Sequence, residues 1–585
     1  MKDNMISQKE ALIELGKRIK KYWYMLAGSM VFAVVYVVLS LYIPKLIGYG
    51  TDKIIDAKKV DFSGLKNVIF TIVICAIVAG IAQWIMGLCN NRITFNVIRD
   101  IREEAFAKTQ RLPVSYIDSR SSGDIVNNVI TDVDQLADGL LMGFSNLFTG
   151  VVTIVLTLIF MLQTNWKIAL VVILITPVSF FVAGFIAKRT YSMFRKQSEI
   201  RGEQTALIDE TISGIKVVKA FGQEENTVKR FDEVNDRLCD VNMKATFYSS
   251  ITNPSTRFVN NLVYAGVTIS GGLEAVLTGG ITVGGLTCIL SYANQYTKPF
   301  NEISGVVTEL SGAFVCAGRI FELLDEAEEA PDSSLGDLIV TEGKVRLENV
   351  SFAYTEGQKL IENLSLTAEG GKRVAIVGRT GSGKTTLINL LMRFYDVNAG
   401  EITVDGTKIR TVNRKSLRSR YGMVLQETFL KTGTVRENLK IGRESATDEE
   451  MIAAAKACHA HGFISRLPQG YDTYITEEVN LSAGQKQLLC IARIMLSLPD
   501  MLILDEATSS VDTRTERRIS DAFDKLMKGR TCFIVAHRLS TIKNADIILV
   551  MEQGNVVEQG NHETLLKKRG YYYNLYTSQF ATPEN

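Results

Sequence analysis

The sequence predicts a two-domain chain: an all-α domain of six membrane-spanning helices, followed by an α/β domain built around a glycine-rich loop. The first half of the 585 residues contains uncharged apolar runs that are long enough to cross a bilayer. The second half alternates short buried strands with helices, and an acidic segment that contains proline and glycine separates the two halves. We therefore expect the membrane domain at 1–325, the linker at 326–340 and the α/β domain at 341–585.

Four apolar runs contain no charge over about the 20 positions that a bilayer core requires. Two further runs are less regular, and we place a tight outer turn between them at Gly279 and Gly280. Long polar loops at 92–138 and 188–250 carry arginine and lysine close to the spans, as is typical of the cytoplasmic side. The first outer loop is also rich in lysine, so the basic residues alone do not decide which side of the membrane each loop faces. We assign the orientation of the spans from the second domain instead. The six spans are expected near 22–44, 67–91, 139–165, 168–187, 255–277 and 281–303.

Polar residues occur within the last two spans, among them Tyr292. Such residues either line a substrate cavity or bond between helices, and the sequence leaves both possibilities open. The formal net charge of +2 argues against a nucleic-acid-binding surface, so no nucleic acid partner is expected. The eight cysteines stand singly, without the spacing of a zinc or redox site.

A glycine-rich loop lies between a predicted buried strand at 373–377 and a predicted helix. This is the context that a phosphate-binding loop requires, because glycines let backbone N–H groups converge on phosphates at a helix N-terminus. Lys384 is expected to reach the β- and γ-phosphates, and the Thr385 hydroxyl to bind Mg²⁺. The predicted ATP-binding residues of this loop are Gly378, Arg379, Thr380, Gly381, Ser382, Gly383, Lys384, Thr385 and Thr386.

A second strand, at 501–504, consists of four apolar residues and ends in Asp505 and Glu506. Such a strand is typical of a parallel sheet that is buried on both faces, and ligands bind at the carboxyl ends of its strands. Asp505 is expected to hold Mg²⁺ through water, and Glu506 to polarise the attacking water. The alternative, a structural acidic pair, is disfavoured by the phosphate-binding loop upstream.

Two more segments, 481–485 (LSAGQ) and 534–540 (IVAHRLS), complete a set of motifs that resembles the ATP-binding cassette (ABC) proteins. Six spans ahead of one cassette resemble the half-transporters of the ABC exporter class. The resemblance implies ATP-driven export of a hydrophobic or amphipathic substrate, with ATP and Mg²⁺ as cofactors. It also implies a multi-pass protein in the plasma membrane of a bacterium, with the cassette and both termini in the cytoplasm.

The resemblance assigns further roles. Tyr354 is similar to the aromatic residue that stacks on adenine. Gln426 resembles the glutamine that touches Mg²⁺ and senses the membrane domain, and His537 resembles the histidine that bonds the γ-phosphate beside Glu506. Asp512 resembles the aspartate of a loop that crosses the cassette interface. The signature residues that would bind the ATP of the partner cassette are Leu481, Ser482, Ala483, Gly484 and Gln485.

Two features depart from the family pattern. Ala483 replaces the middle glycine of the signature, which we expect to be tolerated where φ stays negative. The segment 476–480 before the signature is one residue short and lacks the usual glycine, which puts in doubt its contact with the partner's loops. Short helices at Val114–Asp118 and Gly214–Ala220, at the tips of the cytoplasmic loops, are expected to transmit cassette movement.

Because the signature serves the opposite subunit's ATP, the resemblance implies a dimer with a second half-transporter. Segments 297–304, 416–419 and 509–516 resemble the catalytically complete half of bacterial heterodimeric multidrug exporters, which favours a heterodimer, although a homodimer is possible. Membrane lipid and a small-molecule substrate are the other expected partners. An ATP-gated channel or regulator, or a lipid flippase rather than a drug exporter, remain the alternatives.

Overall fold

The structure is a computed structural model that describes residues 8–54, 60–332, 334–355, 357–358, 360–425, 428–476, 481–505, 512–535 and 542–580. The chain divides into two compact units. One comprises residues 1–112 and 120–327, and the other comprises residues 113–119 and 328–585. The short helix α4 (Val114–Asp118) therefore groups with the C-terminal unit, although it lies early in the sequence.

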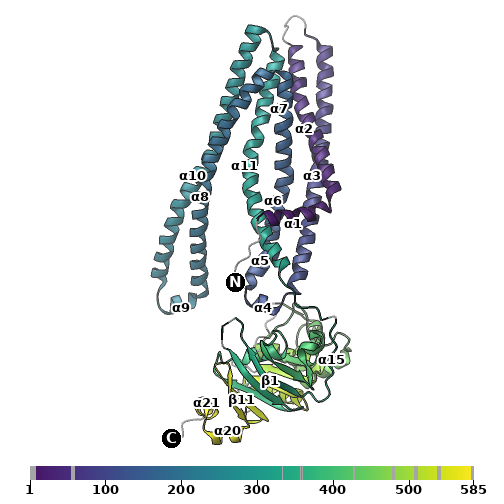
Figure 1. The fold of residues 1–585 in the computed structure, drawn as a ribbon, viewed down its shortest axis with the longest axis vertical. Helices are drawn as coiled ribbons and strands as arrows, with labels where there is room; N and C mark the ends of the chain where they lie inside the picture. Colours follow the sequence, from purple (N-terminus) through teal and green to yellow (C-terminus); the bar gives the residue numbers. More distant parts are fainter. Residues whose placement is uncertain are drawn as a thin grey trace. The chain divides into compact units, whose positions relative to one another are not determined.

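The first unit is helical, and its long helices run side by side as pairs (Figure 1). Helix α2 packs along α3, and α8 packs along α10, with the short α9 at the end of the second pair. A helix is present at each of the two predicted loop tips, as α4 and α9. The unit's elements are α1 (Gln8–Lys20), α2 (Trp23–Asp52), α3 (Phe62–Thr109), α5 (Ser122–Val129), α6 (Thr131–Met142), η1 (Gly143–Leu147), α7 (Phe148–Thr164), α8 (Trp166–Ser213), α9 (Ile215–Ala220), α10 (Glu224–Leu273), η2 (Glu274–Thr278) and α11 (Val283–Asp325).

Four of these helices are far longer than a bilayer is thick, and α11 is the shortest of them with 43 residues. Helices α3 and α8 have 48 residues each and α10 has 50, which corresponds to about 70 Å at 1.5 Å per residue, against roughly 30 Å of hydrocarbon. Among the described residues, three helical segments are apolar and long enough to cross a membrane: Trp23–Asp52, Phe62–Thr109 and Ser122–Thr164. Trp166–Thr176 is a shorter apolar segment. The total of six spans stays a prediction.

Tyr292 illustrates how the polar residues of the last span are used. Its side chain has no exposed surface, and its hydroxyl donates to the Leu41 carbonyl oxygen of α2 at 2.8 Å. Its ring lies 6.0 Å from that of Phe160, edge to face. For Tyr292, interhelical bonding is therefore the observed role, because the hydroxyl is satisfied by backbone inside the bundle.

The second unit contains two large sheets (Figure 1). An antiparallel sheet has the order β2-β1-β4-β5, and a six-stranded sheet has the order β12-β11-β3-β10-β9-β6, in which only β12 is antiparallel. The strands are β1 (Val345–Phe352), β2 (Ile361–Ala368), β3 (Arg373–Gly378), β4 (Ala399–Val404), β5 (Thr407–Lys408), β6 (Tyr421–Val424), β7 (Gly433–Thr434), β8 (Tyr474–Ile475), β9 (Met501–Asp505), β10 (Thr531–Val535), β11 (Ile547–Glu552) and β12 (Asn555–Gly560).

The six-stranded sheet is buried on both faces, as its apolar strands predict. On β3, Val374 and Ile376 pack into one core cluster, and Ala375 and Val377 pack into the other. Helices cover one of these clusters, and the antiparallel sheet covers the other. The helices are α12 (Lys384–Leu391), α13 (Arg414–Ser419), α14 (Val435–Lys440), α15 (Asp448–Ala457), α16 (His461–Ile464), α17 (Ala483–Ser497), α18 (Thr513–Met527), α20 (His562–Lys568) and α21 (Tyr571–Phe580).

The predicted linker packs against the C-terminal unit in its described part. The Arg414 guanidinium donates to Asp332 Oδ1 at 2.6 Å and to the Ala330 carbonyl oxygen at 2.9 Å. Leu338 is fully buried in the core beside the antiparallel sheet. From Glu328 onward, this segment is therefore part of the α/β unit rather than an extended connector.

Candidate functional site

The glycine-rich loop joins β3 to α12 at the carboxyl edge of the six-stranded sheet. A Cβ atom on Gly378 would overlap the Met551 carbonyl oxygen of the neighbouring β11. Gly381 and Gly383 have φ values of +81° and +95°, a region that side chains rarely tolerate. Glycine is thus required at three positions, and the backbone they allow turns tightly onto the N-terminus of α12.

Lys384 turns back over this loop. Its Nζ donates to the carbonyl oxygens of Gly378 and Arg379, both at 2.9 Å, and the residue is only 9% exposed. Burial lowers the pKa of the Lys384 ammonium, and the nearby Asp505 carboxylate partly opposes this effect. A negatively charged ligand in the loop would therefore offer this ammonium a stronger partner than the two neutral carbonyl groups.

The loop offers one buried and one exposed hydroxyl near the start of α12. Ser382 is 3% exposed, and its Oγ has no hydrogen-bond partner within the described part of the chain. Thr385 is exposed in the first turn of α12, next to Lys384. A buried hydroxyl without a partner costs free energy unless a ligand or water satisfies it. The Ser382 hydroxyl lies at the start of α12, where an anion at the helix N-terminus would accept its hydrogen bond.

Three predicted catalytic residues, Gln426, Glu506 and His537, lie outside the described residues. The strands that precede them end side by side, because β6, β9 and β10 are parallel neighbours. Val535 is paired with Asp505, and Val424 with Leu504. All three loops therefore start from the same edge of the sheet as the glycine-rich loop.

Asp505 lies at the end of β9 and interacts electrostatically with Lys384. The described residues contain no group of three or more His, Cys, Asp or Glu side chains that could hold a metal ion. A Mg²⁺ ion at Thr385 and Asp505 would need phosphate oxygens and water as its remaining ligands, which is how Mg²⁺ is usually bound beside nucleotides.

Tyr354 follows β1 and is held by two aromatic neighbours. The rings of Phe352 and Tyr395 each lie 5.0 Å from it, nearly perpendicular to it. The Tyr354 hydroxyl donates to Thr386 Oγ1 at 3.1 Å, which connects it to the glycine-rich loop. The side chain remains 45% exposed, so a ring surface is available for stacking.

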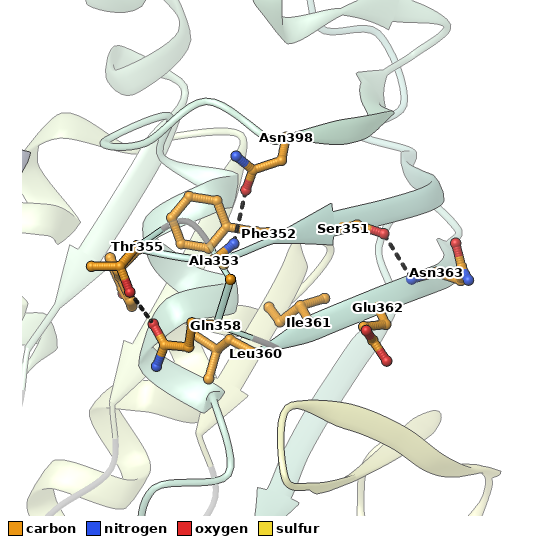
Figure 2. A pocket seen from close by; sticks show the side chains of 12 residues that line it. Ser351, Phe352, Ala353, Thr355, Gln358, Leu360, Ile361, Glu362, Asn363 and Asn398 are labelled. Carbon is orange, nitrogen blue, oxygen red and sulfur yellow. Dashed lines mark hydrogen bonds between the residues drawn. The ribbon is translucent and has the colours of Figure 1, made fainter.

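A hollow of about 500 Å³ lies beside Tyr354, on the turn between β1 and β2 (Figure 2). The Ala353 N–H donates to Asn398 Oδ1 at 2.8 Å, and the Asn363 N–H donates to Ser351 Oγ at 3.0 Å. None of the described residues that line the hollow belongs to the 378–386 loop. The hollow therefore lies on the Tyr354 side of the glycine-rich loop and is not the phosphate site.

Tyr395 is a residue whose role the sequence analysis missed. Its hydroxyl donates to Asp118 Oδ2 of α4 at 2.7 Å. Burial and the Asp118 carboxylate both raise the pKa of Tyr395. Tyr395 therefore touches both Tyr354 and the tip helix that was expected to transmit cassette movement. In the sequence, Tyr395 only ends a predicted helical run. Nothing in that pattern indicates a contact with Asp118, which is 277 positions away.

The signature segment forms the start of α17. Ser482 is the N-cap: its Oγ accepts from the Gln485 N–H at 3.3 Å, and Gln485 Oε1 accepts from the Ser482 N–H at 2.9 Å. Ala483 is exposed at the first helical position and does not have a positive φ. Alanine therefore meets no steric penalty here, and as a helix former it exceeds glycine by up to about 1 kcal/mol.

Asp512 is the N-cap of α18. Its Oδ1 accepts from the backbone N–H groups of Arg514 at 3.1 Å and Thr515 at 3.0 Å. These hydrogen bonds, led by that of Thr515, lower the pKa of the Asp512 carboxyl. Within this chain, the observed role of the side chain is to cap the helix, and the expected interface role needs a second subunit.

Comparisons with known proteins agree with this architecture. The family model described as the ABC transporter transmembrane region matches residues 26–300, and the ABC transporter model matches residues 361–509. A Mycobacterium tuberculosis protein named fatty acid ABC transporter ATP-binding/permease protein is 41% identical over 523 residues, which are 89% of this chain and 83% of that protein.

Two relatives extend the comparison. A Staphylococcus aureus protein, provisionally named a multidrug export ATP-binding/permease protein, is 36% identical over 96% of this chain and 98% of its own length. The solved structure of a bacterial Atm1-family ABC exporter with ATP bound superimposes with a TM-score of 0.77 at 28% identity, and covers 96% of this chain and 99% of that one.

Proposed function

The chain belongs to the ABC transporters, as a half-transporter of the exporter kind, and we propose that it exports a hydrophobic or amphipathic substrate across the bacterial plasma membrane. It is a multi-pass membrane protein and a transport ATPase, with a helical transmembrane domain fused to an α/β cassette that binds ATP. We also propose that the chain has six spans, that its cassette faces the cytoplasm, and that the site residues have the roles given below.

The glycine-rich loop is the main observation that supports ATP binding and hydrolysis. Lys384 presents a charge to the space in which the phosphates would lie, and Ser382 presents a hydroxyl that has no partner among the described residues. Tyr354 presents a braced ring surface for the adenine. We assign Glu506 to polarise the attacking water, with His537 and Gln426 beside it. Thr385, Asp505 and Gln426 would hold Mg²⁺, which neutralises the charge that develops on the phosphates.

The relatives' names support a substrate with a large apolar part. One relative is named for fatty acids and another for multidrug export. Both substrate classes partition into a bilayer, and a path along membrane helices suits them. A fatty acid or a similar amphiphile is therefore the first substrate to test, with a cationic dye as the second.

Transport can be measured with the purified protein in sealed vesicles whose cassettes face outward. We expect ATP-dependent uptake of a fluorescent amphiphile against its gradient, and steady phosphate release that stops when ATP is withdrawn. An exporter accumulates substrate only while ATP turns over. Downhill flux that follows ATP binding without steady hydrolysis would instead favour the ATP-gated channel.

Transporters of this kind act as dimers. We propose a heterodimer in which this chain contributes Lys384, Glu506 and His537 to the working site. Its partner would contribute the opposing signature and would lack the equivalent of Glu506. This chain's own signature, with Ala483, would then serve the partner's impaired site.

A mixing experiment tests this assembly. This chain alone is expected to show low ATPase activity, and activity should rise at least about tenfold when the partner half-transporter is added. Light scattering on the same samples gives the oligomeric state. If the chain alone forms a stable dimer with two equivalent working sites, the homodimer is correct and the heterodimer is wrong.

A further inference from the structure

A second cavity lies in the helical unit and is distinct from the ATP site. It has a volume of about 370 Å³ and is lined by residues of α1, α2, α3, α6, η1, α7 and α11. Figure 1 shows α1 lying across the long helices rather than along them. We call this cavity the α1 pocket; six of its apolar lining residues are Leu15, Ile19, Leu26, Leu140, Phe144 and Phe314.

The pocket lies where α6 packs closely against α11 and continues into the turn η1. Gly139, which precedes the lining residue Leu140 on α6, contacts α11 so closely that a Cβ on Gly139 would overlap the Ala313 Cβ. Directly after α6, the backbone enters the π-helical turn η1, whose residues Gly143, Phe144 and Leu147 line the pocket. A π-helical turn inserts an extra residue and often marks a functional site. The cavity therefore opens where the helix register changes.

The pocket has a polar floor and an open rim. Asn90 is fully buried; its Oδ1 accepts from Ser29 Oγ, and its Nδ2 donates to Ser145 Oγ at 3.3 Å. At the rim, Leu12 is 52% exposed and Met30 is 39% exposed. Met30 belongs to α2, which is apolar and long enough to cross a membrane, and Leu12 belongs to α1. Exposed apolar side chains on such helices face lipid, so the pocket is accessible to a molecule from the bilayer.

Basic residues lie next to this rim. Lys17, Arg18 and Lys20 form the last turn of α1, and Ile19 between them lines the pocket. Arg18 is bonded to Glu104 at 2.7 Å, which fixes α1 against α3. Lys20 is exposed and has no ion-pair partner among the described residues. A helix of this kind lies at the membrane interface, where lysine attracts anionic groups.

We propose that the α1 pocket binds one acyl chain of an anionic amphiphile, with the anionic group held at Lys20. Its volume lies near the lower end of the ~300–1,000 Å³ that small-molecule sites span, so one hydrocarbon chain fits inside it and the second chain of a phospholipid would stay outside. A free fatty acid and a membrane phospholipid share this chemistry. Binding of a ligand in the α1 pocket is a property separate from transport, and it can be measured without ATP.

Photo-crosslinking in nanodiscs tests the proposal with the full-length protein. A fatty acid with a diazirine in its chain, and an anionic phospholipid with the same modified chain, serve as the two probes. Peptide mass spectrometry is expected to find labels concentrated on the segments that line the pocket. Whichever probe labels at the lower concentration identifies the source of the chain. Labels spread evenly over the lipid-exposed helices would overturn the proposal.

Two test variants and one control variant make the result more specific. Leu147→Trp fills the pocket and should reduce its labelling at least about tenfold, whereas Val155→Trp, at an exposed position on α7, should leave it unchanged. Lys20→Glu should weaken the fatty acid probe at least about fivefold and spare a fatty alcohol of equal length. Melting curves verify that each variant is folded, and the Lys20 arm remains available if Leu147→Trp is not. Unchanged labelling in folded variants would contradict the assignment.

Discussion

Glu506→Gln is expected to retain ATP binding and to lose most turnover, with closed dimers that trap ATP. The substitution keeps the size of the side chain and removes its charge, so it removes the group that polarises the water. Loss of a general base typically costs 10²–10⁴-fold in rate. The measurement is phosphate release beside nucleotide binding, in the assembled dimer.

The matched control is Glu563→Gln, which changes an exposed carboxylate on α20. It should leave both binding and turnover unchanged. Near-normal turnover in Glu506→Gln, with the dimer verified, would refute the role of this residue. A loss of ATP binding in the same variant would mean that Glu506 supports the site's structure instead.

Lys384→Ala is expected to weaken ATP binding itself, by at least about tenfold. The ammonium already bonds two carbonyl oxygens of the loop, at 2.9 Å each. With ATP bound it would bond phosphates, and hydrogen bonds to charged groups contribute about 1.5–3 kcal/mol each. Titration with a fluorescent ATP analogue gives the affinity, and turnover falls as a consequence.

Lys372→Ala is the control for this variant, because Lys372 directly precedes β3 at its other end. There the Lys372 ammonium forms an exposed ion pair with Asp546 at 3.0 Å. Its affinity for ATP should match that of the unmodified protein. If Lys384→Ala also matched it while remaining folded, Lys384 would not be the lysine that grips the phosphates.

The local structure of the site was predictable because it depends on residues close in the chain. Glycines in a fixed order predict the loop after β3, since neighbouring φ angles decide its shape. Ser482 and Gln485 form their capping box within one helical turn. The apolar run 501–504 predicts a strand buried on both faces, which the two core clusters confirm.

Other features depend on segments that are distant in sequence. The order of strands places β3 between β11 and β10, and so brings the loops after β6, β9 and β10 to the edge where Lys384 lies. Tyr292 could have lined a cavity, and only the approach of α2 shows that its hydroxyl bonds Leu41. In each case, side-chain packing between distant segments selects the partner.

The sequence by itself determined the two fold classes and the family, and it predicted the chemistry of the glycine-rich loop, because periodicity and short motifs record local structure. Only the tertiary structure decided that Tyr395 joins Tyr354 to Asp118, and that six helices and a π-helical turn enclose the α1 pocket. The physical reason is that a contact or a cavity belongs to surfaces from several elements. No single stretch of chain carries its pattern.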